Sequence, residues 1–127
     1  MSDHVERLLA ECGECDFGRE IRARVVTLLE IDRALKWRVS ELVALVRERS
    51  DDFDADHMRY FLREFASGRR VGPAVLRVTG PGVVVFMDGA HRTAAALLAR
   101  RQTVRLVVLG YDGDEDAFEN IVGKLAA

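Results

Sequence analysis

The chain has 127 residues, enough for one domain that buries a hydrophobic core without disulfides or a metal ion. Its formal net charge is −2, so it lacks the overall excess of lysine and arginine that is typical of nucleic-acid-binding modules. No apolar run approaches the roughly 18 residues of a membrane-spanning helix, and residues 1–4 do not resemble a signal peptide. We therefore expect a single cytoplasmic domain over residues 1–127 that binds neither membranes nor nucleic acid.

The N-terminal part of the chain, about residues 1–50, predicts a helical extension. Ser2 can cap a short first helix, and Ser40 can cap a later helix that ends near Arg49. Residues 19–36 fit either a helix or a strand, because their apolar residues have helical spacing while 25–31 are rich in β-branched residues. The apolar face of the first helix would consist of Val5, Leu8, Leu9 and Cys12, and that of the later helix of Leu42, Val43 and Val46.

Cys12 and Cys15 are the only two cysteines and form a Cys-Gly-Glu-Cys motif. This spacing fits either a redox pair or half of a zinc site. A zinc site requires further ligands at finger-like spacing, which the sequence does not provide. A thioredoxin-type pair would follow a strand, whereas these cysteines follow a helix-like stretch. We therefore interpret them as two reduced cysteines at the end of a helix.

The second half of the chain has clear turn signals between its predicted elements. Asp54 can cap a helix in which Met58, Phe61, Leu62 and Phe65 recur at helical spacing, and Gly68 can end that helix. The turn at 79–82 contains Gly-Pro-Gly and predicts an antiparallel hairpin. The remaining predicted elements are the hairpin strands 74–79 and 83–87, a helix over 91–101, a strand over 103–109 and a last helix over about 114–125.

The stretch from Val83 to Leu98 contains the strongest functional signal. Residues 83–87 are all apolar, which predicts a strand buried on both faces. The run stops at Asp88-Gly89, and an Ala/Leu-rich helix begins almost at once. The first N–H groups of a helix have no partners within it, and its dipole adds positive charge there. Together with His91 and Arg92, this turn predicts an anion site, with phosphate as the expected anion.

The side chains near this turn have several possible roles. Asp88 can cap the helix, orient His91, or hold a Mg²⁺ that bridges to phosphate. The Thr93 hydroxyl can reach the anion or turn outward. Arg69 and Arg70 can clamp nucleotide phosphates or lie in a solvated loop. The candidate phosphate- and nucleotide-binding residues are Asp88, Gly89, Ala90, His91, Arg92, Thr93, Arg69 and Arg70, with Asp88 also the candidate metal ligand.

Residues 88–95, Asp-Gly-Ala-His-Arg-Thr-Ala-Ala, are similar to the D-G-x-H-R-x-A-A motif of the ParB/sulfiredoxin superfamily. Residues 61–78 resemble that family's helix, glycine and "P-I-x-V" strand, and residues 103–108 resemble its closing strand. The resemblance covers about residues 55–110. It implies an α+β fold, a small mixed β-sheet with the hairpin at its centre and helices around it. Because the family opens with a strand followed by an acidic residue, it also favours a strand over 24–31.

The branch of the superfamily decides the expected chemistry. Sulfiredoxins carry a catalytic cysteine where Ala90 stands, so their reaction is not expected here. The CTP-binding partition proteins have an arginine-rich G-E-R-R version and a downstream DNA-binding domain, neither of which the sequence shows. The free-serine kinases carry a D-G-x-H-R motif like this one. They use a glutamate near the end of the first strand as a base, and Glu30 or Asp32 would take that place.

The resulting hypothesis is an ATP- or ADP-dependent enzyme that uses Mg²⁺ and transfers a phosphoryl group to a small-molecule acceptor, or hydrolyses the nucleotide. Phosphoryl transfer requires neutralised phosphates and an in-line nucleophile, with little covalent chemistry by the protein. Glu30 or Asp32 would accept the proton of the attacking hydroxyl. The alternative is a non-catalytic nucleotide-sensing module, and a third hypothesis, a nuclease or DNA-binding protein, is disfavoured by the net charge.

Overall fold

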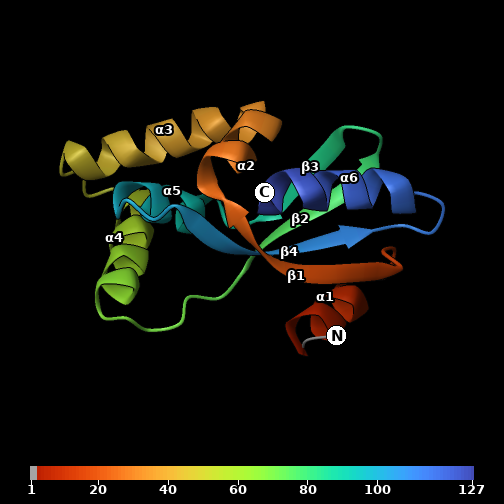
Figure 1. Cartoon of the computed structure of the whole chain (residues 1–127). Helices are drawn as coiled ribbons and strands as arrows, with labels where there is room; N and C mark the ends of the chain where they lie inside the picture. The colour runs from red at the N-terminus through yellow and green to blue at the C-terminus, as the bar shows by residue number, and fades with distance from the viewer. Residues whose placement is uncertain (1–2) are drawn as a thin grey trace.

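The computed structural model of the chain describes residues 3–127. Within them, a four-stranded mixed sheet and six helices form an α+β fold (Figure 1). No helix in this range combines the length and apolar character that crossing a membrane requires. The elements in chain order are α1 (Asp3–Cys12), β1 (Phe17–Arg24), α2 (Val25–Ile31), α3 (Arg33–Arg47), α4 (Phe53–Ala66), β2 (Ala74–Gly80), β3 (Val83–Asp88), α5 (Ala90–Leu98), β4 (Thr103–Gly110) and α6 (Glu115–Ala126).

The strands are ordered β1-β4-β2-β3 across the sheet. β2 and β3 form the predicted antiparallel hairpin, β4 pairs with β2 in parallel, and β1 pairs with β4 in antiparallel fashion. The mixed sheet is therefore confirmed. The expectation that the whole hairpin lies at the centre of the sheet holds for β2 only, because β3 forms one edge.

The prediction that residues 83–87 are buried on both faces is wrong. Val83, Val85 and Met87 are exposed, whereas Val84 and Phe86 alternate with them and are half-buried. A run of apolar residues looks the same in sequence whether one or both faces of its strand are covered. On this edge strand only one face is covered by helices.

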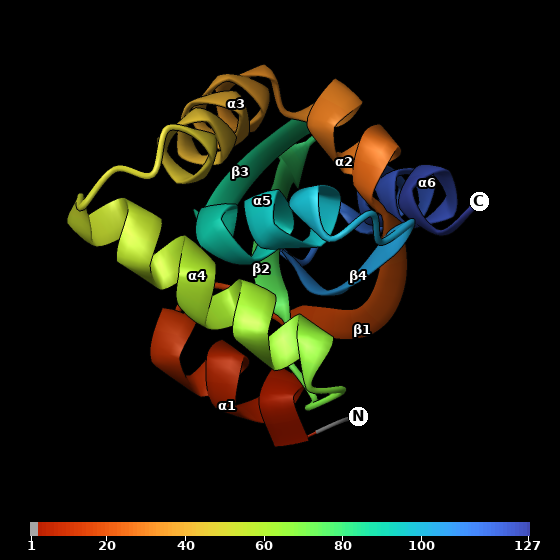
Figure 2. The same cartoon turned by 90° about the vertical axis from the view of Figure 1, so that its left-hand side faces the viewer.

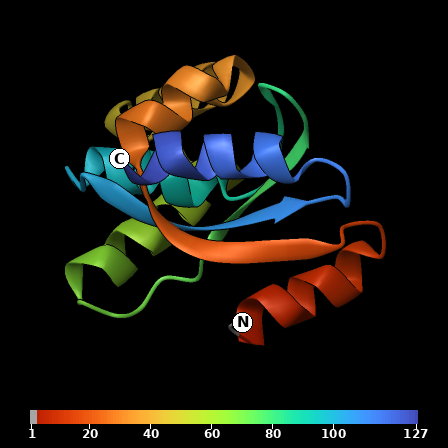
Figure 3. The same ribbon diagram turned by 45° about the vertical axis from the view of Figure 1, so that its right-hand side comes forward.

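Helices cover the two faces of the sheet unequally. Among residues 3–127, α1 packs under β1 and β4, while α2, α5 and α6 lie on the other face (Figure 3). The sheet therefore separates two hydrophobic cores, a larger one under α2, α5 and α6 and a smaller one under α1. Successive side chains of β4 point into one core and then the other: Leu106 and Val108 lie in the larger core, and Val107 and Leu109 in the smaller one. α4 lies beside α5 and α3 at one end of the sheet (Figure 2). The start of α5 is thereby placed between β3, α3 and α4.

The predicted strand over residues 24–31 is also wrong. Residues 25–31 form α2, in which Val25 and Leu28 are buried at helical spacing. The first strand, β1, comes earlier, over Phe17–Arg24. Its charged residues conceal the strand pattern, because it is an edge strand and can expose their side chains.

Two predicted helix caps lie at the wrong residues. Asp32, not Ser40, caps α3 by accepting a hydrogen bond from the Leu35 N–H at 2.9 Å. Asp52, not Asp54, caps α4 by accepting from the Asp54 N–H at 2.8 Å. Ser40 lies within α3 and donates to the Lys36 carbonyl, four residues earlier. The predicted cap at Ser2 lies outside the described residues.

These caps predict opposite effects of two alanine substitutions. Asp52→Ala should lower the free energy of unfolding by about 1 kcal/mol, because it leaves a helix-terminal N–H without its acceptor. Ser40→Ala should leave stability unchanged or raise it by a few tenths of a kcal/mol, because alanine is the better helix former at an interior position. Urea unfolding followed by circular dichroism measures both. Equal losses in the two variants would contradict the cap assignment.

Candidate functional site

The structure confirms the predicted turn from β3 into α5. Gly89 stands between them with φ 111°, a left-handed conformation that favours glycine. A Cβ at this position would lie 2.4 Å from the Ala74 Cβ, so the turn is packed tightly against the first residue of β2. The Thr93 N–H is bonded to the Gly89 carbonyl, which leaves the N–H groups of the preceding first turn of α5 without acceptors inside the helix.

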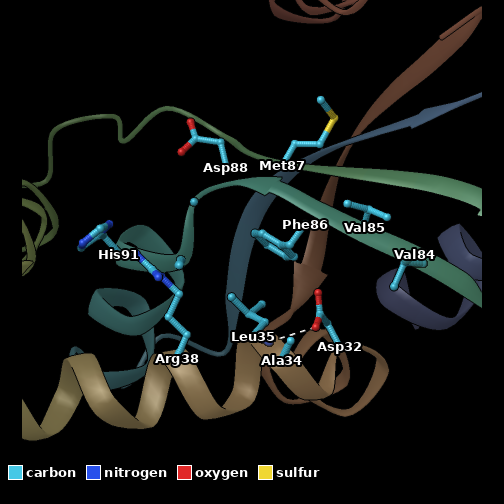
Figure 4. A pocket seen from close by; sticks show the side chains of 12 residues that line it. Asp32, Ala34, Leu35, Arg38, Val84, Val85, Phe86, Met87, Asp88 and His91 are labelled. Carbon is cyan, nitrogen blue, oxygen red and sulfur yellow. Dashed lines mark hydrogen bonds between the residues drawn. The ribbon is translucent and has the colours of Figure 1, made fainter. Parts of the chain in front are cut away.

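A cavity of about 540 Å³ lies beside this turn, between the start of α3, the covered face of β3 and the start of α5 (Figure 4). Phe86 and Leu35 point toward each other and form an apolar wall. The Arg38 side chain extends from α3 toward the first turn of α5. The lining residues with charged or titratable side chains are Asp32, Arg38, Asp88 and His91.

His91 is oriented by a carboxylate from another helix. Its Nε2 lies 2.8 Å from Asp54 Oδ1 at the start of α4, and the ring meets the His57 ring edge-on at 5.2 Å between centroids. This contact fixes the imidazole between α4 and the cavity. Nδ1 remains as the ring nitrogen that can interact with a ligand.

Asp88 and Arg92 pair with each other on the other side of the turn. Arg92 Nη1 lies 3.3 Å from Asp88 Oδ2, and it donates to the Pro73 carbonyl at 2.8 Å. The pairing of β2 with β3 shifts register at Met87, so Asp88 does not continue the alternation of Val84 and Phe86. Both residues also line a smaller cavity of about 270 Å³ beside α1. The motif is thus divided, with His91 at the larger cavity and the Arg92 guanidinium directed away from it.

Thr93 cannot contact a bound anion in this structure. Its side chain is fully buried, and Oγ1 has no hydrogen-bond partner among residues 3–127. The expectation that this hydroxyl reaches the anion or turns outward is corrected by its position on the inner face of α5.

Arg69 and Arg70 do not join the turn at Gly89 either. They line a separate cleft of about 700 Å³ between the end of α4, β1 and β4. Arg69 Nη1 lies 3.3 Å from Glu64 Oε1, and Arg70 Nη2 lies 4.0 Å from Glu20 Oε1. The other arginines that line this cleft are Arg22, Arg100, Arg101 and Arg105.

The two candidate bases have different positions. Glu30 is exposed on α2 and does not line the cavity, because the stretch that carries it is a helix and not the expected strand. Its assignment as the base is therefore withdrawn. Asp32 lines the cavity while one of its oxygens caps α3, so its second oxygen can accept a proton.

Sequence reasoning missed Arg38 and the partner of His91. Arg38 has no hydrogen bond or ion pair to any residue that the structure describes, and it lines the cavity together with Asp32. Asp54 was expected only as a helix cap. The contact between Asp54 and His91 spans 37 residues of sequence, and no local pattern indicates it.

Within residues 3–127, no group of three or more His, Cys, Asp or Glu side chains is arranged to hold a metal ion. Asp88 would therefore hold Mg²⁺ only together with ligand oxygens and water, which is how Mg²⁺ is commonly bound beside phosphates. No protein-family model matches the chain, and neither a curated protein nor a solved structure is significantly similar to it. The resemblance to the ParB/sulfiredoxin superfamily thus stays a prediction from the motif.

Proposed function

We propose that the chain is a ParB/sulfiredoxin-like protein that binds ATP or ADP with Mg²⁺ in the cavity between α3, β3 and α5. In this proposal it transfers the terminal phosphoryl group to a hydroxyl of a small molecule, or to water. The observation that carries the proposal is the meeting of a free helix N-terminus with Arg38 and His91 at one end of an apolar cavity. This combination suits a ligand with an anionic end and an apolar body.

The phosphates would bind at the start of α5. The N–H groups of its first turn point out of the helix, and the dipole adds partial positive charge at this end. Arg38 supplies a full charge without losing an ion pair, because it has none within the described residues. A charged hydrogen bond of this kind contributes about 1.5–3 kcal/mol.

The base of the nucleotide would lie against the apolar wall. Phe86 offers a ring face, and Leu35 and Val84 flank it along the same cavity. A volume of about 540 Å³ is within the usual range of small-molecule sites. Mg²⁺, when bound, would neutralise phosphate charge, and Asp88 is the carboxylate nearest the turn in sequence.

Asp32 is the proposed general base. Its capping hydrogen bond to Leu35 fixes the carboxylate at the rim of the cavity, on the side of Val84 (Figure 4). Its second oxygen would accept the proton of an acceptor hydroxyl that lies between Asp32 and the terminal phosphate at the start of α5. The same capping role supports the alternative of a nucleotide sensor, because it accounts for Asp32 without catalysis. The two functions differ only in turnover.

Calorimetric titration with ATP and ADP, with and without Mg²⁺, tests the binding step. We expect binding by the native chain and a loss of affinity of about tenfold or more in Arg38→Ala, from the contribution of a charged hydrogen bond. Arg47→Ala is the matched control, because Arg47 is exposed on the same helix and lies outside the cavity. Absence of nucleotide binding, or equal affinities in the two variants, would refute the proposal.

A further inference from the structure

Two thiols lie together on the face of the sheet that α1 covers, opposite to the proposed nucleotide cavity. Cys12 is the last residue of α1, and Cys15 lies in the turn before β1. Their Sγ atoms are 3.0 Å apart and share a hydrogen bond. The intervening turn contains Gly13 with φ 70°, a conformation that lets the chain bring the two side chains together.

The two thiols have different environments. Cys15 packs into the small core with Val5, Val107 and Leu109, whereas Cys12 is only partly buried at its rim. Burial raises the pKa of the Cys15 thiol to about 11. The hydrogen bond from Cys15 lowers the pKa of the Cys12 thiol. Cys12 is therefore suited to act as the attacking thiolate, and Cys15 as the resolving thiol.

Arg77 places a positive charge beside the pair. It extends from β2 on the same face, with its guanidinium 5.8 Å from the Tyr111 ring centroid and Nη1 3.7 Å from Glu14. Its Nε is buried and has no hydrogen-bond partner among residues 3–127. A hydrogen bond from the Arg77 side chain also contributes to lowering the pKa of the Cys12 thiol, because a donor that contacts the sulfur favours the thiolate. This opposes the dipole of α1, whose C-terminal end disfavours a negative charge.

We propose that Cys12 and Cys15 form a redox-active dithiol that exchanges with disulfides. The Cys12 thiolate attacks one sulfur of a disulfide RSSR, the substrate S–S bond breaks, and one RS⁻ leaves and takes a proton from solvent. Cys15 then loses its proton and attacks Cys12 Sγ in the mixed disulfide, which releases the second RS⁻. In the balance, two protein thiols are oxidised to one disulfide while one substrate disulfide is reduced to two thiols.

This assignment differs from the interpretation of the motif as two reduced cysteines at the end of a helix. That interpretation rested on the position of the pair after a helix and not after a strand, and the structure confirms this position between α1 and β1. What the sequence does not show is the contact between the two thiols, the burial of Cys15 and the position of Arg77 beside them, because these arise only in the folded chain. None of them involves the nucleotide cavity, so the proposal is independent of nucleotide binding.

The test uses the full chain and oxidised glutathione as the disulfide probe. After incubation at pH 7 and acid quenching, mass spectrometry should show an internal Cys12–Cys15 disulfide that reduced glutathione reverses. In Cys15→Ala the glutathionyl adduct should instead remain on Cys12, because no resolving thiol is present. Failure of the native chain to form the internal disulfide, or an equally lasting adduct in both proteins, would overturn the proposal.

Alkylation rates provide a second measurement, which leaves both cysteines of the motif in place. In the native chain, iodoacetamide should modify Cys12 at least about tenfold faster than Cys15. The reason is that the thiolate is the reactive form, and a larger fraction of Cys12 than of Cys15 is thiolate. Cys12 should also react faster in the folded chain than in urea at the same pH. Arg77→Gln should reduce this advantage, whereas Arg22→Gln, an exposed position on β1, should not. A Cys12 thiol that reacts no faster when folded would contradict the assignment.

Discussion

Gly89→Ala should lower the free energy of unfolding by about 2–5 kcal/mol, one of the largest losses that a single methyl group can cause in this chain. Its φ of 111° is strained for any residue with a Cβ, which costs about 1–2 kcal/mol. The added Cβ would also lie 2.4 Å from the Ala74 Cβ and 2.9 Å from its Cα, and such overpacking costs about 1–3 kcal/mol more. Because β2 is a central strand, Ala74 has little room to move away.

Gly113→Ala is the control that separates the two causes. Gly113 has φ 95°, also in the left-handed region, but a Cβ there would meet no atom within 4 Å. Its loss should therefore be limited to backbone strain, about 1–2 kcal/mol. Urea unfolding of both variants measures the difference. If Gly89→Ala is no less stable than Gly113→Ala, the result would contradict the tight packing of the turn against β2.

The fold of the second half could be predicted because its signals are local. Glycines mark the end of α4 and the hairpin turn, and the apolar spacing between them matches the observed elements. β1 could not be predicted in this way, because its charges have partners that only the folded chain provides. Arg19 pairs with Glu119 at 3.0 Å between Nη1 and Oε2, and Glu20 pairs with Arg105.

In the candidate site, too, the features with local sequence signals could be predicted, and those that depend on distant residues could not. The turn at Gly89 and the start of α5 were predicted from consecutive residues, and the structure confirms them. The directions of the side chains were not predictable, because a register shift turns Asp88 toward Arg92 and a distant carboxylate holds His91. The arginine-lined cleft shows why net charge says little about local charge. Arginines from β1, β4 and the loops before β2 and β4 gather there in a chain whose net charge is −2.

Asp32→Asn should reduce turnover on the order of 10²-fold or more while nucleotide affinity stays nearly unchanged, if the protein transfers phosphoryl groups as proposed. Asparagine is as good a helix cap as aspartate, so its side-chain oxygen can still accept from the Leu35 N–H and keep α3 in place. What the substitution removes is the ability to accept a proton. The measurement is ADP release from ATP and Mg²⁺ with a panel of small hydroxyl compounds, including free serine.

Glu30→Gln is the matched control, because it neutralises a carboxylate only two residues away in sequence. Glu30 is exposed on α2 and outside the cavity, so this variant should keep native turnover. Equal turnover in all three proteins would exclude Asp32 as the base and leave nucleotide binding in place. Nucleotide binding without turnover in the native chain would instead favour the sensor, since Asp32 would then serve only to begin α3 at the edge of a binding cavity.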